Sequence, residues 1–217
     1  MPFNRWVWAV MVLVLAALAY KTRDDFETYF AGVGTLQVQA EPGETSIRLK
    51  WRGKIAAPMA QRIAEVAETY RDDPRPFVLT LSSPGGSLDH GAEVIRLLDK
   101  IKEKHKLETV VEDGRRCASM CVPVYLQGQP RVAGADAQFM FHEVSFREYL
   151  AKENSDVPEA ARARATDELF DRYFASAGVS PEWIRTTRTQ MSGGNDVWKT
   201  ARELMAELSG IVQEITE

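Results

Sequence analysis

A strand, a glycine turn, a helix and a second strand follow one another in the middle of the chain. Residues 77–81 read Phe-Val-Leu-Thr-Leu, a short apolar run typical of a strand buried on both faces. Ser-Pro-Gly-Gly at 83–86 ends this run, apolar residues then recur at helical spacing across 94–101, and Thr-Val-Val at 109–111 predicts another strand. This β-α-β order predicts an α/β fold with a largely parallel sheet and helices packed around it.

The flanking segments extend the same pattern. Apolar and polar residues alternate on both sides of Glu-Pro-Gly-Glu at 41–44, which predicts a hairpin, and helical spacing follows over 59–70. Val132 and the run 139–141 indicate further strands, and 158–174 is expected to be helical. The inward-facing residues expected on that last helix are Leu169, Tyr173 and, as a third candidate, Phe170.

The N-terminal segment differs from the rest of the chain. Residues 6–20 carry no charge, and as a helix they would span roughly 22 Å, close to the thickness of a membrane core. Ala-Leu-Ala at 17–19 has the form of a signal-peptidase site, whereas tryptophans at one end and Tyr20 at the other favour an uncleaved hydrophobic anchor. Both interpretations place the body of the protein outside the cytoplasm, in the cell envelope: on the periplasmic side of the inner membrane if the anchor is retained, or secreted to the periplasm if it is cleaved.

Three regions follow from this reading. We expect a signal anchor or signal peptide over 1–23, a linker and first strand over 24–44, and one folded domain over 45–217. Acidic residues outnumber basic ones for a net charge of −4, and no basic block occurs, so nucleic-acid binding is not expected. The chain has no Walker-type loop to bind ATP phosphates, and neither a cofactor nor a metal site is expected.

Three short segments have residue types that can carry chemistry. The glycines at 85 and 86 can turn backbone N–H groups toward a ligand, although many α/β folds use glycines in such turns. Cys-Ala-Ser-Met-Cys at 117–121 places Ser119 after a strand, where a serine is more often only a helix cap. His142 ends an apolar run, where a histidine is more often a core or rim residue. His90 and His105 suit a helix start and a solvated helix end.

The order of these segments resembles the Clp protease catalytic subunit. The resemblance covers roughly residues 45–212 and is strongest from Leu79 to His142. It implies the β-α-β superhelical fold of the ClpP/crotonase superfamily, with Ser119 as nucleophile and His142 as general base. It also implies that the amides of Gly86 and Met120 form the oxyanion hole. The Cys-Ala-Ser-x-Cys form is closer still to membrane-associated or periplasmic bacterial Clp-like serine peptidases.

The same resemblance suggests the third member of a triad. In Clp subunits this acid lies just before a Ser/Thr-Ala-x-Glu segment, which Thr-Ala-Arg-Glu at 200–203 resembles. Asp196 stands four residues before that threonine, so it is expected to hold the far nitrogen of His142. The preceding loop is about two residues longer than the family pattern, and the alternative is an aspartate in a polar turn. Asp171 and Glu182 are weaker candidates.

The resemblance also bears on partners. A peptide or unfolded protein is the expected substrate, and a homo-oligomer is expected. The glycine-rich stretch that follows the histidine in Clp subunits is absent, and 143–158 is longer and charged, which argues against a double heptamer. Nothing in the sequence indicates a partner ATPase.

Three other functions compete with the peptidase. A catalytically silent Clp-like binding module would keep the fold, and a crotonase-type acyl-CoA enzyme would share the oxyanion hole. A Ser–Lys dyad would need a lysine near Ser119, but Lys199 lies in the wrong segment.

Cys117 and Cys121 lie on either side of Ser119, four residues apart. On a regular helix such residues have Cβ atoms about 5–6 Å apart, and a disulfide needs about 3.5–4.5 Å. An exported protein would permit a bridge, and a distorted turn before the helix would allow one. Two buried thiols are nevertheless the expectation, and a metal site fits least, because two cysteines lack nearby partner ligands.

Overall fold

A computed structural model describes residues 34–145 and 158–217. The larger sheet has six strands in the order β1-β2-β3-β4-β6-β9. These strands are β1 Thr35–Gln39, β2 Ile47–Arg52, β3 Phe77–Ser82, β4 Leu107–Val111, β6 Arg131–Gly134 and β9 Glu214–Thr216. Only the β1–β2 hairpin in this sheet is antiparallel, so the prediction of a largely parallel sheet is confirmed.

A second sheet contains the strands that lead to Ser119 and His142, two of the residues singled out as candidates for chemistry. It consists of β5 Arg116–Ala118, β7 Gln138–Phe141 and β8 Val197–Thr200 in the order β5-β7-β8. The pairing of β5 with β7 is parallel, and that of β7 with β8 is antiparallel. This small sheet places the ends of β5 and β7 next to each other.

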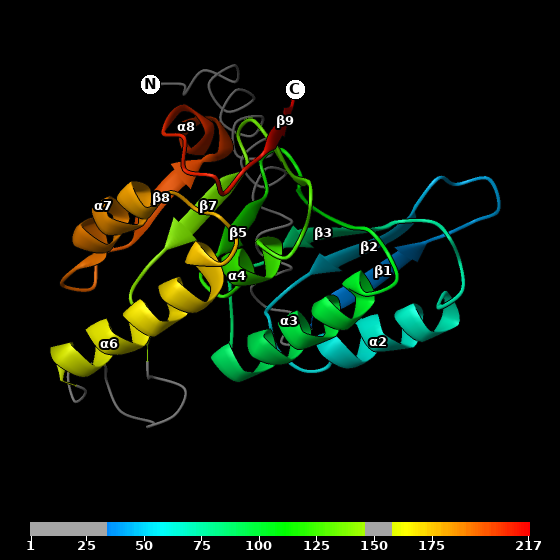
Figure 1. Cartoon of the computed structure of the whole chain (residues 1–217), viewed down its shortest axis with the longest axis horizontal. Coiled ribbons are helices and arrows are strands. Elements are labelled where there is room, and N and C mark those ends of the chain that lie inside the picture. The colour runs from blue at the N-terminus through cyan, green and yellow to red at the C-terminus, as the bar shows by residue number, and fades with distance from the viewer. Residues whose placement is uncertain (1–33, 146–157) are drawn as a thin grey trace, which may run out of the picture.

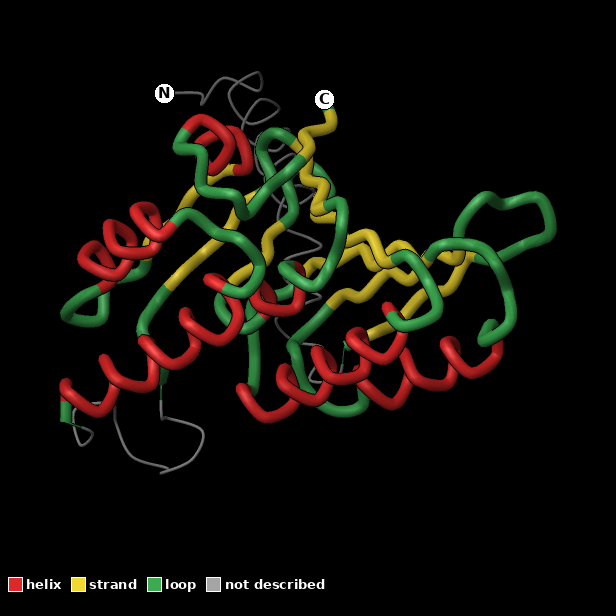
Figure 2. Tube along the Cα trace, viewed as in Figure 1, coloured by secondary structure: helices red, strands yellow, loops and turns green. Residues whose placement is uncertain are grey.

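Helices lie around the two sheets. They are α2 Met59–Thr69, α3 Leu88–Lys102, α4 Cys121–Tyr125, α6 Glu159–Leu169, α7 Pro181–Met191 and α8 Ala201–Ala206, with a π-helical segment η2 Phe170–Ala175 that continues α6. Figure 1 shows α2 and α3 side by side below the strands β1 to β3, while α6 extends away from the large sheet. Figure 2 shows the same layers with helices in red and strands in yellow.

Alternation along the strands explains the core of the large sheet. Leu49 pairs with Leu79 and Trp51 pairs with Leu81 in the β2–β3 register. All four side chains are at most 1% exposed, because in a strand every second residue points to the same face. The predicted hairpin, the helix over 59–70 and the central β-α-β unit are thereby confirmed.

The segment predicted as one helix over 158–174 differs in detail. It is an α-helix that becomes a π-helix at Phe170, and the wider turn changes which side chains face inward. Phe170 and Phe174 are buried and their rings stack with centroids 4.1 Å apart, while Leu169 and Tyr173 are only partly buried. Leu169 and Tyr173 pack against the core as predicted, although only partly buried, Phe170 is buried, and Phe174 was missed.

The predictions for residues 1–23, and for 24–33 of the linker, lie outside the described residues. Within the described part of the chain, no helix has the length and apolarity needed to cross a membrane.

Candidate active site

The two small-residue turns predicted from sequence lie beside each other. Ser83, directly after β3, forms an isolated parallel bridge with Cys117 of β5. The Ala118 amide donates to the Ser83 carbonyl at 3.0 Å, and the Ser83 amide donates to the Arg116 carbonyl at 2.9 Å. These bonds join the turn 83–86 to the turn that holds Ser119.

Ser119 has a backbone conformation that is uncommon for a residue with a side chain. Its φ is 53°, in the left-handed region, which costs about 1–3 kcal/mol unless the surroundings impose it. Its amide donates to the carbonyl of Met140 at 2.8 Å, and its own carbonyl accepts from the Val122 amide at 2.9 Å. Strand β7 and the start of α4 therefore hold the serine from both sides.

His142 follows β7 directly and faces Ser119. Its Nε2 lies 2.8 Å from Ser119 Oγ, and its Nδ1 lies 2.5 Å from the carbonyl oxygen of Glu143. Because a carbonyl can only accept, Nδ1 carries the proton and Nε2 accepts from the Ser119 hydroxyl. The structure thus brings the two residues predicted as nucleophile and base into direct hydrogen-bond contact.

The two residues predicted for an oxyanion hole, Gly86 and Met120, line the same cavity as Ser119 and His142. Gly86 runs along Ile55, whose amide donates to the Gly85 carbonyl and whose carbonyl accepts from Ser87. Among residues 34–145 and 158–217, neither the Gly86 nor the Met120 amide has a hydrogen-bond acceptor. Two unpaired N–H groups flanking a serine hydroxyl can bind a developing negative charge.

Asp196 lies close to His142 in the antiparallel pairing of β7 with β8, but its side chain does not contact His142. Val197 of β8 pairs with Phe141 of β7, so Asp196 comes one residue before that pair and His142 one residue after it. The side chain of Asp196 is nevertheless exposed and forms no hydrogen bond with any described residue, and Nδ1 of His142 faces the Glu143 carbonyl. The structure does not join Asp196 to His142, and its triad role stays a prediction.

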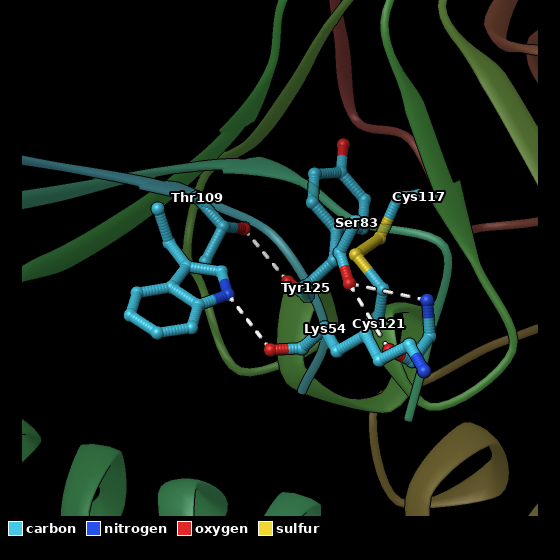
Figure 3. The surroundings of a disulfide bond; sticks show 8 residues. Lys54, Ser83, Thr109, Cys117, Cys121 and Tyr125 are labelled. Atoms are coloured by element: carbon cyan, nitrogen blue, oxygen red, sulfur yellow. Dashed lines mark hydrogen bonds between the residues drawn. A yellow bond between two sulfur atoms is a disulfide. The ribbon is translucent and has the colours of Figure 1, made fainter. Parts of the chain in front are cut away.

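The two cysteines form a disulfide, so the expectation of two buried thiols was wrong. Cys117 and Cys121 have Cα atoms 5.2 Å apart and neither side chain is exposed. Cys117 belongs to strand β5 rather than to a helix, so the helical i, i+4 spacing does not apply. Figure 3 shows the bridge beside Ser83 and Tyr125.

A cavity of approximately 330 Å³ opens onto Ser119 and His142. Both predicted oxyanion residues, Gly86 and Met120, also line it. Its apolar lining residues are Pro84, Leu88, Met120, Met140, Phe141, Val144, Leu169, Phe170 and Phe174. Sequence reasoning missed most of these as site residues, although the apolar spacing from Phe170 to Phe174 was a usable signal.

Charged groups are few in this cavity. Lys54 and Glu143 line it, and the Glu143 carboxylate lies 3.6 Å from Arg162 Nε, too far for a direct hydrogen bond. Glu143 Oε2 is buried without a hydrogen-bond partner among the described residues. Below the site, burial raises the pKa of Tyr125 far above its ordinary value of 10. The site therefore combines a polar Ser–His pair with an apolar wall.

The weaker candidates lie elsewhere. His90 Nδ1 is 3.6 Å from the Glu93 carboxylate, and His105 packs its ring against Phe77 at 4.8 Å. Asp171 and Glu182 are exposed, and Lys199 forms an ion pair with Glu207. None of these five candidates lines the cavity at Ser119. In the described part of the chain, no group of three or more His, Cys, Asp or Glu is arranged to hold a metal ion.

Comparison with known proteins gives the fold. No protein-family model and no curated protein matches the chain. Among solved structures, a variant of ClpP1 from Listeria monocytogenes is similar, with a TM-score of 0.58 and 21% identity over 76% of this chain and 87% of that chain. The chain therefore has a ClpP-like fold, as the sequence resemblance implied. At this identity the likeness extends to the fold alone.

Proposed function

We propose that this chain is a serine peptidase in which Ser119 attacks the peptide carbonyl and His142 serves as general base. The observation that carries the proposal is the 2.8 Å contact between Ser119 Oγ and His142 Nε2, within a cavity that Gly86 and Met120 also line. A nucleophile, a base oriented by a third group, and unpaired amides beside them form the arrangement that acyl transfer requires.

The steps follow from the positions of these atoms. His142 Nε2 takes the hydroxyl proton as Ser119 Oγ bonds to the carbonyl carbon, and then returns it to the leaving amine. The amides of Gly86 and Met120 bind the oxyanion, each contributing about 3 kcal/mol to lowering the barrier. Water then attacks the acyl-enzyme by the same route. The Glu143 carbonyl keeps the proton on Nδ1, and in this conformation it orients the ring and fixes its tautomer, one of the two roles of a triad carboxylate.

The cavity supports a preference for apolar substrates. Phe170, Phe174 and Met140 are among its walls, and a bulky apolar side chain next to the scissile bond would remove their surfaces from water. Peptides or unfolded protein segments are the substrates that present such side chains in extended form. A homo-oligomer is plausible for this fold, and we propose one here without a stated number of subunits.

We further propose that the enzyme is exported and membrane-tethered on the periplasmic side. Two features support this: the uncharged segment 6–20 in the sequence, and a disulfide, which persists in oxidising compartments and is rare in the cytosol. Fusing alkaline phosphatase to the C-terminus checks the location, because that reporter folds only where disulfides form. An inactive fusion present at normal abundance would contradict export.

Labelling with a fluorophosphonate probe tests the catalytic assignment. The full-length protein is expected to acquire one label that is absent from Ser119→Ala and slowed by orders of magnitude in His142→Ala. A matched control is Ser87→Ala, which removes another hydroxyl near the cavity by disrupting only the cap of α3. A folded wild type without label would instead favour the silent binding module.

A further inference from the structure

The disulfide lies directly beneath the turn that carries the nucleophile. Cys117 is in β5 and Cys121 is the first residue of α4, so the bridge closes a five-residue loop with Ser119 at its centre. Both sulfur-bearing side chains are fully buried. The bridge therefore joins the end of β5 to the start of α4, on either side of the proposed nucleophile Ser119.

The backbone of Ser119 is hydrogen-bonded on both sides, to Met140 and to Val122, but other parts of the turn have less to fix their shape. Helix α4 has only five residues, too short to be stable without outside contacts. Ser119 holds a positive φ that a residue with a Cβ adopts only when its surroundings impose it. The Met120 amide has no acceptor among the described residues, so no hydrogen bond of its own fixes its direction. A covalent link between Cys117 and Cys121 restricts the backbone of residues 118–120 and the start of α4 together.

The disulfide is also linked, through the backbone pairing of Cys117, to the glycine turn at 83–86, which holds Gly86. Cys117 is the residue that pairs with Ser83, and the Ser83 hydroxyl accepts from the Gly85 amide at 3.1 Å. The dashed lines in Figure 3 show this hydroxyl bonded within its own turn, beside the disulfide. A shift of Cys117 would thus move both the serine and the chain that leads to Gly86.

We propose that the Cys117–Cys121 disulfide is a positioning element for acylation, so that the oxidised protein is the active form. This inference rests on the proposed peptidase function. Neither cysteine touches the reacting atoms; their effect passes through the backbone of Ser119 and Met120. Reduction by a dithiol adds two electrons and two protons, yields two thiols, and leaves the dithiol as its cyclic disulfide. The freed turn then samples arrangements in which the hydroxyl and the amides no longer converge.

The test compares full-length protein in three states. These are the oxidised wild type, the wild type reduced with dithiothreitol and verified by thiol counting, and the double variant Cys117→Ala with Cys121→Ala. Ile63→Ala is the matched control, since Ile63 is fully buried on α2 and does not line the cavity, so its loss weakens the core without touching the turn. For each, the fluorophosphonate labelling rate is measured against probe concentration at a temperature where circular dichroism shows folded protein.

We expect reduction and the double variant to lower the maximal labelling rate by roughly 10–100-fold, since small misplacements of reacting groups cost that much. The probe concentration that gives the half-maximal labelling rate should change little. Reoxidation should restore the labelling rate of the wild type but not that of the double variant. Ile63→Ala should label within about 3-fold of wild type. The Ser119 amide, bonded to Met140, should also exchange with deuterium faster after reduction.

The two hypotheses fail in different ways. Equal labelling of the oxidised and reduced wild type would overturn the positioning role and leave the peptidase intact. Slowing on reduction no greater than that of Ile63→Ala would do the same. An oxidised wild type that does not label at all would overturn the peptidase, and the catalytic role of the disulfide with it. If the double variant does not fold, the reduced wild type alone decides the question.

Discussion

Gly85 and Ser119 are in such close contact that no other residue fits at position 85. A Cβ on Gly85 would lie 2.7 Å from Ser119 Cβ and 2.9 Å from the Ala118 carbonyl oxygen. Gly85 also has a φ of +98°, which side chains rarely allow. The glycine turn thus has a second use besides leaving the Gly86 amide without an acceptor: Gly85 makes room for the nucleophile.

The first prediction concerns this contact. Gly85→Ala should displace Ser119 and lower its fluorophosphonate labelling rate by roughly 100-fold, because the clash is with the nucleophile itself. Gly43→Ala is the matched control, since Gly43 has a similar φ of +103° but open space around its Cβ position. The control should lose about 1 kcal/mol of unfolding free energy, yet label normally. Normal labelling of Gly85→Ala would contradict the arrangement described here.

The second prediction concerns the acceptor for His142. Asp196→Asn should change the labelling rate by no more than about 5-fold, because the Glu143 carbonyl already holds Nδ1 and the Asp196 carboxylate is exposed. A triad aspartate would behave differently, with losses near 10⁴-fold on conversion to asparagine. Asn195→Asp with Asp196→Asn, which moves the carboxylate by one residue, serves as the charge-matched control. A loss of 100-fold or more in Asp196→Asn alone would establish Asp196 as the third member.

The third prediction concerns Tyr125, which is fully buried beside the disulfide. Its hydroxyl has no hydrogen-bond partner among the described residues, and burial raises its pKa. Tyr125→Phe should therefore raise the unfolding free energy by about 1 kcal/mol, because a buried polar group without a partner is destabilising. Tyr70→Phe, at a half-buried position, should be near neutral. Chemical denaturation measures both, and a loss of stability in Tyr125→Phe would show that its hydroxyl has a partner after all.

The fourth prediction is a pH dependence of stability at the hairpin. Hydrogen bonds from Arg75 lower the pKa of Asp73 from 3.8 to about 2, and Arg75 also donates to the Glu41 carbonyl in the β1–β2 loop. Since the folded-state pKa is depressed, this pair stabilises the fold above pH 4, and its contribution is lost as pH falls toward 2. Asp73→Asn should be less stable than wild type at pH 6.

The measurement is the difference in thermal midpoint between wild type and Asp73→Asn at pH 6, 4, 3 and 2. The gap should shrink across the lower part of this range. Arg75→Gln should show a weaker pH dependence of stability than wild type. Its Asp73 keeps the hydrogen bond from the backbone amide of residue 75 but loses the guanidinium donors, which lower the pKa of Asp73 most. A gap that is constant from pH 6 to pH 2 would contradict the role of the Asp73–Arg75 pair.

Local patterns were sufficient for much of the fold. The run 77–81 and the spacing across 94–101 depend on burial of near neighbours, and both elements occur where they were predicted. Tertiary packing overrode the pattern over 158–174, because the π-turn at Phe170 shifts the inward face. Helical spacing assumes a regular helix, so it placed Leu169 and Tyr173 against the core, where they are partly buried, but it missed Phe174, which is buried.

The site divides in the same way. Ser119, His142 and the glycine turn could be singled out because their order resembles that of Clp subunits. The residue pattern alone favoured a helix cap for Ser119 and a core or rim position for His142. The acceptor for His142 could not be singled out, since an exposed aspartate and a backbone carbonyl compete for Nδ1, and only the path of the chain after β7 decides between them.

The sequence by itself determined the central β-α-β order, because apolar periodicity and turn residues report local structure. It singled out Ser119 and His142 only through the resemblance to the Clp family. Only the tertiary structure decided the positive φ of Ser119, the bridge between Cys117 and Cys121, and the apolar wall at Met140 and Phe174. These features depend on where β5, β7 and α6 lie relative to one another. Such distances are set by the packing of segments far apart in the chain, and no spacing along the sequence encodes them directly.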